Sequence, residues 1–172
     1  MTRFAQTAPG IISVLLLSPT LYLWAIGRYA IDDRGYLAVN ALAVGAQLCW
    51  VWSVYRLAVH SRPGVERSWG RWTFGVAALV AVLAGFVLPG ATWTQSPETL
   101  FDLVSIDILV ILAALSFGAC HWVAAKALIE AEASERRAVG TFLLMVCLVI
   151  GVWFLRPRVL ALSNSDPGLS AD

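Results

Sequence analysis

The sequence LVSIDILVILAALSFGACHWVAA, residues 103–125, is apolar along almost its whole length. It is long enough to cross the hydrocarbon core of a bilayer, which takes about 20 residues of α-helix. It carries Asp107, the one carboxylate that lies well inside an apolar run, and His121 on the same helical face. Because roughly 21 Å of helix separates these two residues, they cannot form a catalytic pair.

The composition of the whole chain extends this picture. Hydrophobic residues make up 59% of the 172 residues and charged residues 13%, and the mean hydropathy is +0.76. Soluble domains contain about 25% charged residues, and a small domain has too much surface to hide such an excess of apolar residues. We therefore predict an all-α fold, a polytopic integral membrane helix bundle that forms a single transmembrane domain over residues 1–172.

Apolar runs divide the chain into its expected helices. Five transmembrane helices are predicted, at residues 9–27, 36–59, 72–88, 97–134 (with the membrane part at 103–125) and 138–155. The first run is predicted to be a retained helix rather than a signal peptide, with a kink at Pro19 that neighbouring hydroxyls can accommodate. The fifth run is predicted to end at Pro157, because proline disfavours helix at the residue before it. Residues 159–172 are then expected to form a disordered tail.

Small residues repeat every four positions in two of the runs. Ala41 and Gly45 in the second run, and Ala77, Ala81 and Gly85 in the third, are typical of close helix packing in membranes.

The distribution of basic residues predicts the orientation. With the N-terminus in the cytoplasm, five spans place eight of the 12 Lys and Arg residues inside, as the positive-inside rule requires. Arg156 and Arg158 then lie outside, against this rule. A four-span alternative, with one run re-entrant or removed, would bring them inside. All but one of the basic residues are arginine. This composition is typical of bacteria with GC-rich genomes and therefore favours a bacterial cytoplasmic (inner) membrane.

This threading places one polar group near the outer face. Asn40 and Asp107 lie a few residues inside their helices, with Arg28 and Arg34 in the neighbouring loop and Gln47 midway across. A charge in hydrocarbon is costly unless it is paired or hydrated. We expect Asp107 to be paired structurally with Arg28, Arg34 or Asn40, and the alternative is a proton or ion site.

A second polar group is expected near the inner face, where Arg56, His60 and His121 lie. Two histidines on facing helices could ligate haem, although interfacial histidines are the favoured interpretation. The three cysteines lie inside apolar runs and have no CxxC spacing, so free thiols are expected rather than disulfides or zinc ligands. No catalytic or nucleotide-binding motif is present, so no catalytic, cofactor or metal residue is assigned.

The function expected from these features is non-enzymatic. The protein is predicted to act through helix-mediated interactions, as an accessory, assembly or regulatory subunit. Its expected partners are the lipid bilayer and either itself or another membrane protein, and its net charge of +1 gives no indication of nucleic acid. The alternatives are a small proton- or ion-coupled transporter that uses Asp107 and a haem-binding redox subunit.

Overall fold

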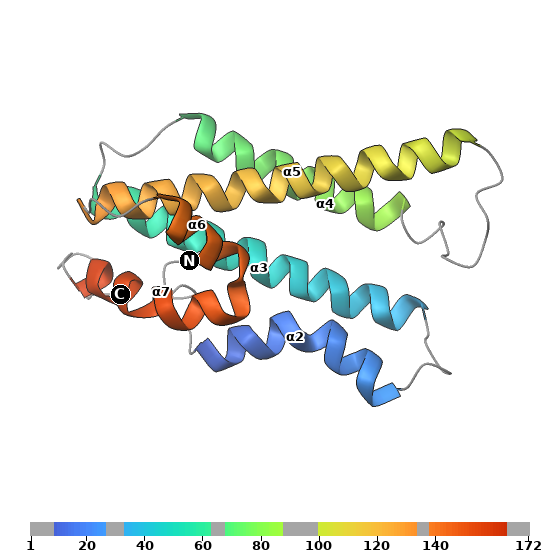
Figure 1. Ribbon diagram of the computed structural model, residues 1–172, viewed down its shortest axis with the longest axis horizontal. Helices are drawn as coiled ribbons and strands as arrows, with labels where there is room; N and C mark the ends of the chain where they lie inside the picture. The colour runs from blue at the N-terminus through green and yellow to red at the C-terminus, as the bar shows by residue number, and fades with distance from the viewer. Residues whose placement is uncertain (1–8, 27–32, 63–67, 88–99, 134–137, 165–172) are drawn as a thin grey trace.

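The computed structural model describes residues 9–26, 33–62, 68–87, 100–133 and 138–164. Within these ranges the protein is all helical and has no strand, as the sequence predicts. The helices are α2 (Pro9–Ile26), α3 (Asp33–Ser61), α4 (Ser68–Val87), α5 (Leu100–Ala131), α6 (Ala138–Val146) and α7 (Leu148–Asn164). Helix α3 packs against α2 and α5, α4 packs against α5, and α6 and α7 cover one end of the bundle (Figure 1).

Two of the described helices are long and apolar enough to cross a membrane. They are Ala38–Ser61 within α3 and Ile111–Ala131 within α5. The described parts of α2 and α4 contain shorter apolar helices, Pro9–Leu21 and Trp69–Leu83. Length and composition thus support two of the five predicted crossings.

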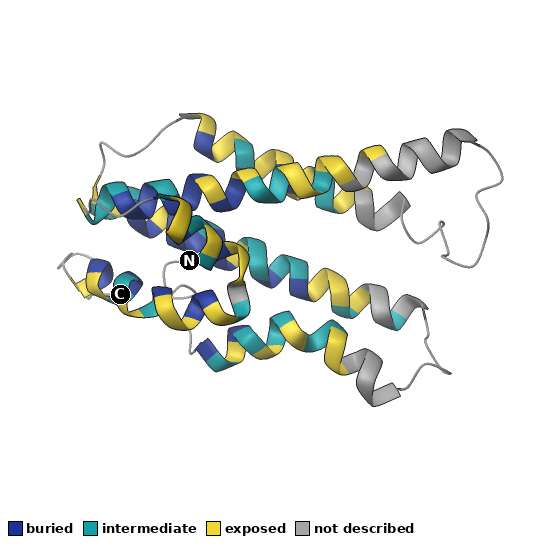
Figure 2. Cartoon of the chain, viewed as in Figure 1, coloured by how far each residue is buried: buried dark blue, intermediate teal, exposed yellow. Residues whose placement is uncertain are grey.

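Buried residues are concentrated at one end of the bundle, where α3, α5, α6 and α7 meet (Figure 2). The largest fully buried side chains there include Trp50, Leu128 and Leu155. Large apolar side chains elsewhere point outward, and Trp72 on α4 and Leu115 on α5 are 75% and 65% exposed. An apolar surface of this extent is typical of contact with lipid or with another protein.

Two prolines, Pro19 and Pro157, lie inside helices rather than at their ends. In α2, Pro19 cannot donate to the carbonyl of Leu15, and the Ser18 hydroxyl donates to that carbonyl instead, at 2.7 Å. This confirms the predicted accommodation by a neighbouring hydroxyl, and Figure 1 shows α2 bent near its middle. Pro157 lies within α7, so the prediction that it ends the helix was wrong.

The predicted tail changes accordingly. Residues 159–164 are helical, and residues 165–172 lie outside the described residues.

The fifth apolar run is not one straight helix. Instead α6 ends at Val146, and after Cys147 the chain turns back as α7. Arg158 Nη1 donates to the Thr141 hydroxyl at 3.1 Å, whereas the same two residues would lie about 26 Å apart along a continuous helix. The prediction of one span over residues 138–155 is corrected to a hairpin of two helices.

The fourth run forms the longest helix, α5, but it ends earlier than predicted. Residues 97–99 lie outside the described residues, and the last helical residue is Ala131 rather than residue 134. Ala133 adopts a left-handed conformation with φ of 49°, and its N–H donates to the Glu130 carbonyl at 3.3 Å. A left-handed residue ends a helix and is usually glycine, so the sequence carried no clear signal for this stop.

Candidate functional site

The most buried polar side chain among the described residues, His121, joins α5 to α3. His121 on α5 is 2% exposed, and its Nδ1 lies 2.6 Å from the carbonyl oxygen of Phe117. Because a carbonyl can only accept, Nδ1 carries the hydrogen and Nε2 of the neutral ring is the acceptor. The amide Nε2 of Gln47 on α3 donates to that atom at 3.1 Å. The imidazole is thus fixed in one tautomer between two helices.

His121, predicted to lie near the inner face of the membrane, is buried within the bundle. Gln47 was grouped with Asp107 and Asn40, and the structure pairs it with His121. Since both ring nitrogens have hydrogen-bond partners, His121 has no free lone pair for a metal or haem iron in this conformation.

The neighbouring residue ties α5 to a third helix. Cys120 is fully buried, and its thiol lies 3.6 Å from the carbonyl of Thr73 on α4, within the range of a weak S–H···O hydrogen bond. Adjacent residues of α5 therefore contact α3 and α4. Cys49 and Cys147 are exposed, and none of the three is in a disulfide.

The two histidines do not share a site. His60 is exposed on α3, about 20 Å along the helix from Gln47, which holds His121. Axial haem ligands must bind opposite sides of one iron, which this separation prevents. Among the described residues there is also no group of three or more His, Cys, Asp or Glu side chains that could hold a metal.

Most of the predicted outer group lies outside the residues that the structure describes. Arg28 and the side chains of Arg34 and Asp107 lie outside the described residues, and Asn40 is exposed on α3. The pairing of Asp107 therefore stays a prediction.

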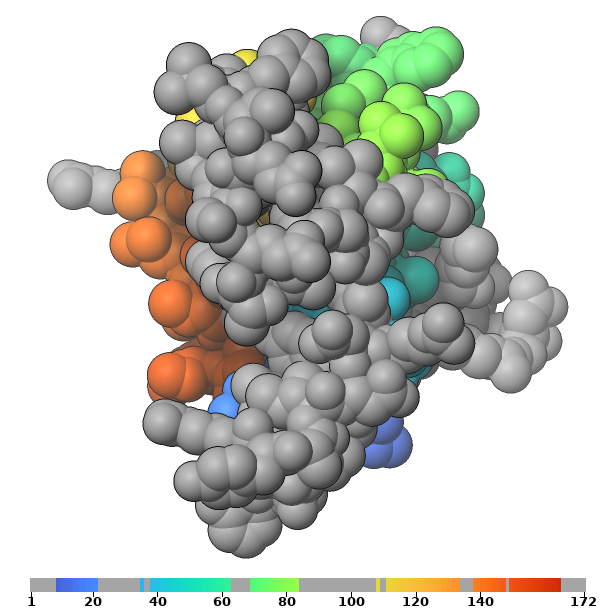
Figure 3. All heavy atoms as spheres, turned by 90° about the vertical axis from the view of Figure 1, so that its right-hand side faces the viewer, coloured from blue at the N-terminus to red at the C-terminus, as the bar shows by residue number. Residues whose placement is uncertain are grey.

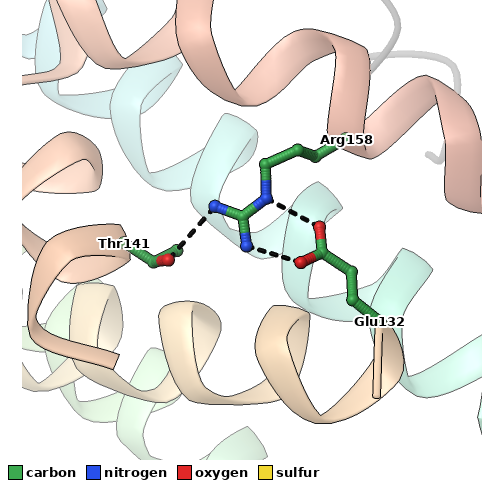
Figure 4. Close-up of polar contacts among 3 residues, drawn as sticks. All are labelled: Glu132, Thr141 and Arg158. Carbon is green, nitrogen blue, oxygen red and sulfur yellow. Dashed lines mark hydrogen bonds and ion pairs between the residues drawn. The ribbon is translucent and has the colours of Figure 1, made fainter. Parts of the chain in front are cut away.

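The charged contacts of the described residues lie at the opposite end of the bundle. Arg158 of α7 binds Glu132 in a bidentate ion pair, with Nε–Oε1 at 2.7 Å and Nη2–Oε2 at 2.6 Å, and also donates to Thr141 (Figure 4). Both side chains of the pair are about 85% buried, with 14% and 16% exposed. The pair holds α7 against the end of α5 and the start of α6.

Two more arginines lie at this end. Arg62 Nη1 donates to the Glu130 carbonyl at 2.8 Å and so joins the end of α3 to the end of α5. Arg56 is exposed, and its guanidinium lies 5.8 Å from the centre of the Trp52 ring, at cation–π distance.

Along one face of α3, the helices that the structure describes leave side chains exposed. Ala41, Leu42 and Cys49 are exposed on it, and no atom outside the helix backbone lies within 4 Å of a Cβ built on Gly45. In contrast, Ala77 of the second predicted packing face is fully buried. Ala41 of the first small-residue pair is therefore exposed and Gly45 is half-buried, although the pair was predicted to pack against a neighbouring helix.

These three places, the Gln47–His121 contact, the basic end and the open face of α3, are the candidate functional regions of the described chain. No protein-family model, curated protein or solved structure matches this chain.

Proposed function

We propose that the protein is an integral membrane protein that acts by helix–helix association, as an accessory, assembly or regulatory subunit. The observation that carries this proposal is the small-residue face of α3, which consists of Ala41, Gly45 and the exposed residues beside them, Leu42 and Cys49. Helices in lipid associate where small residues allow their backbones to come close. Because the protein's own helices leave this face open, a helix from a second copy or from another membrane protein can occupy it.

The polar contacts support a structural role for the interior. Gln47 and His121 satisfy each other, and Arg158 is paired with Glu132 and Thr141. Such contacts fix how the helices pack. Because these interior groups are paired with one another, we expect other molecules to contact the outer surface of the described protein, which is largely apolar.

The threading that fits this proposal has four crossings and a re-entrant pair. If α2 to α5 cross the bilayer, the α6–α7 hairpin enters from the end where α5 finishes and returns to it. Arg156 and Arg158 then lie on the same side as Arg56, Arg62 and Lys126. The positive-inside rule assigns this basic end to the cytoplasm, and with it the N-terminus. This is the four-span alternative, in a bacterial cytoplasmic membrane.

Cysteine cross-linking in membranes tests the association, because Cys49 lies one turn beyond Gly45 on the same face. In a Cys120→Ser, Cys147→Ser background, copper phenanthroline should join Cys49 to a second copy or to a partner's thiol. Gly45→Leu should abolish the cross-linked species, since a large side chain separates the helices. Ala78→Leu, at an exposed small residue of α4, is the matched control and should leave it intact.

The result that contradicts the proposal is also defined. If native mass spectrometry in mild detergent shows only the monomer, and Cys49 forms no cross-link in membranes, the association does not occur.

The two alternatives have less support. A proton- or ion-coupled transporter depends on Asp107, whose side chain lies outside the described residues, and Gln47, assigned to the same site, is bonded to His121. A haem-binding subunit requires His60 and His121 to approach one iron. The distance of about 20 Å along α3 between His60 and Gln47, the hydrogen-bond partner of His121, opposes this.

A further inference from the structure

The guanidinium of Arg156 is incompletely satisfied. Its Nε is buried and has no hydrogen-bond partner among the residues that the structure describes. Arg158, two residues later, has all three of its nitrogens hydrogen-bonded. A buried N–H without an acceptor is costly, and the Arg156 side chain as a whole is only half-buried, so turning its guanidinium toward an acceptor on another molecule would stabilise it.

The surroundings of Arg156 indicate the depth at which that molecule lies. Trp153, about one turn earlier on α7, is 57% exposed, and its indole N–H donates to the Ser13 hydroxyl of α2 at 3.3 Å. Phe154 beside it is 64% exposed. Exposed aromatic residues followed by arginines are typical of the boundary between hydrocarbon and headgroups. Arg156 is therefore at the depth of lipid phosphates if the protein is inserted as proposed.

Among the described side chains, positive charge predominates at this end of the bundle. The described basic side chains are Arg56, Arg62, Arg71, Lys126, Arg156 and Arg158. The described acidic side chains are Glu130 and Glu132, which leaves an excess of four positive charges.

Contacts between helices show that these residues share one end. Arg62 reaches the end of α5, and Arg158 reaches Glu132 just beyond it. Gly70, next to Arg71, packs against the Tyr55 ring, next to Arg56. Like charges gathered in this way repel unless anions lie among them.

We propose that this basic end, which includes Arg156, binds the phosphate groups of anionic phospholipids in the cytoplasmic leaflet. The planar guanidinium matches phosphate oxygens in geometry and charge, and the surrounding cations add attraction for a net-negative lipid. The inference rests on the membrane insertion and orientation given under Proposed function, and it goes beyond them by naming a ligand class and a residue.

The test compares lipids that differ only in headgroup charge. Native mass spectrometry of the full-length protein, titrated with phosphatidylglycerol or with phosphatidylcholine of the same acyl chains, measures the lipids retained. The wild type should retain phosphatidylglycerol preferentially. Arg156→Gln should lower its affinity by about fivefold. Arg34→Gln removes the same charge from the first turn of α3, at the other end of that helix, and should retain the preference.

A further variant separates binding from misfolding. Arg156→Lys keeps the charge without the planar fork, so it should bind anionic lipid better than Arg156→Gln while unfolding at a similar temperature. Equal retention of the two lipids by the wild type would overturn the proposal, and so would unchanged binding in Arg156→Gln. Neither outcome would affect the Cys49 cross-link, so this inference and the proposed association can fail separately.

Discussion

Replacing Gly151 by alanine tests whether the fifth apolar run folds back on itself. Gly151 is buried in the first turn of α7, and a Cβ on it would lie 2.6 Å from the carbonyl carbon of Leu144 and closer still to its oxygen. The carbonyl carbon alone would have to move by about 0.8 Å to reach the 3.4 Å of ordinary contact, and the nearer oxygen requires the two backbones to separate by more than that. Overpacking of this kind costs about 1–3 kcal/mol, and the upper part of the range applies because the obstacle is backbone rather than a mobile side chain.

A control in the same hairpin gives the opposite expectation. Gly140 in α6 has no atom within 4 Å of its Cβ position, so Gly140→Ala should stabilise the protein by about 0.5 kcal/mol through helix propensity. Unfolding in increasing mole fractions of sodium dodecyl sulfate, followed by tryptophan fluorescence, measures both variants. We expect a net loss of about 2 kcal/mol for Gly151→Ala. If Gly151→Ala instead stabilised the protein as Gly140→Ala does, the run would be a straight helix and the hairpin would be refuted.

Three other substitutions probe contacts that define the bundle. Arg158→Gln should lower the free energy of unfolding by about 1.5–3 kcal/mol in the same assay, because it leaves the largely buried Glu132 carboxylate without its charged partner. Combining it with Glu132→Gln should cost less than the sum of the two single changes. His121→Leu should cost about 1 kcal/mol by leaving the Gln47 amide unpaired, and adding Gln47→Leu should recover part of that loss; additive losses would contradict the contact. Ala133→Gly should raise the free energy of unfolding by up to about 1 kcal/mol, since it removes the strain of a left-handed alanine. A lowered free energy of unfolding would contradict that backbone conformation.

The helices of the bundle could be predicted from the sequence, because membrane-length apolar runs are a strong signal. Predicted runs at 36–59 and 72–88 correspond to α3 and α4, with ends that differ by a few residues. Helix ends set by tertiary contacts were harder to predict. The stop after Ala131 depends on one left-handed alanine, and Pro157 lies within a helix although proline more often marks an end in sequence.

The candidate sites were less predictable, because they depend on which helices become neighbours. Gln47 and His121 are far apart in sequence, and nothing in the periodicity of either helix indicates that the two would meet. The sequence placed Gln47 midway across the membrane and His121 near the inner face, because depth was counted in residues from each helix end, as if the helices were parallel. When two helices cross at an angle, residues counted to different depths can meet, and a long side chain such as glutamine extends the reach further.

The charges and the fold of the fifth run explain each other. A straight helix over 138–155 would carry Arg156 and Arg158 across the bilayer, away from the other described basic residues. Folding back at Cys147 requires a residue without a Cβ where α7 passes the end of α6, and Gly151 meets this requirement. The turn returns Arg158 to Glu132, so that its charge is neutralised at the end of α5. From the sequence, Arg156 and Arg158 were exceptions to the positive-inside rule in the five-span prediction, and the four-span alternative brought them inside, while the hydropathy favoured a fifth span. The hydropathy alone is ambiguous here, because an apolar run of this length fits a hairpin that packs one side on α2, α3 and α5 as well as it fits a single membrane-spanning helix.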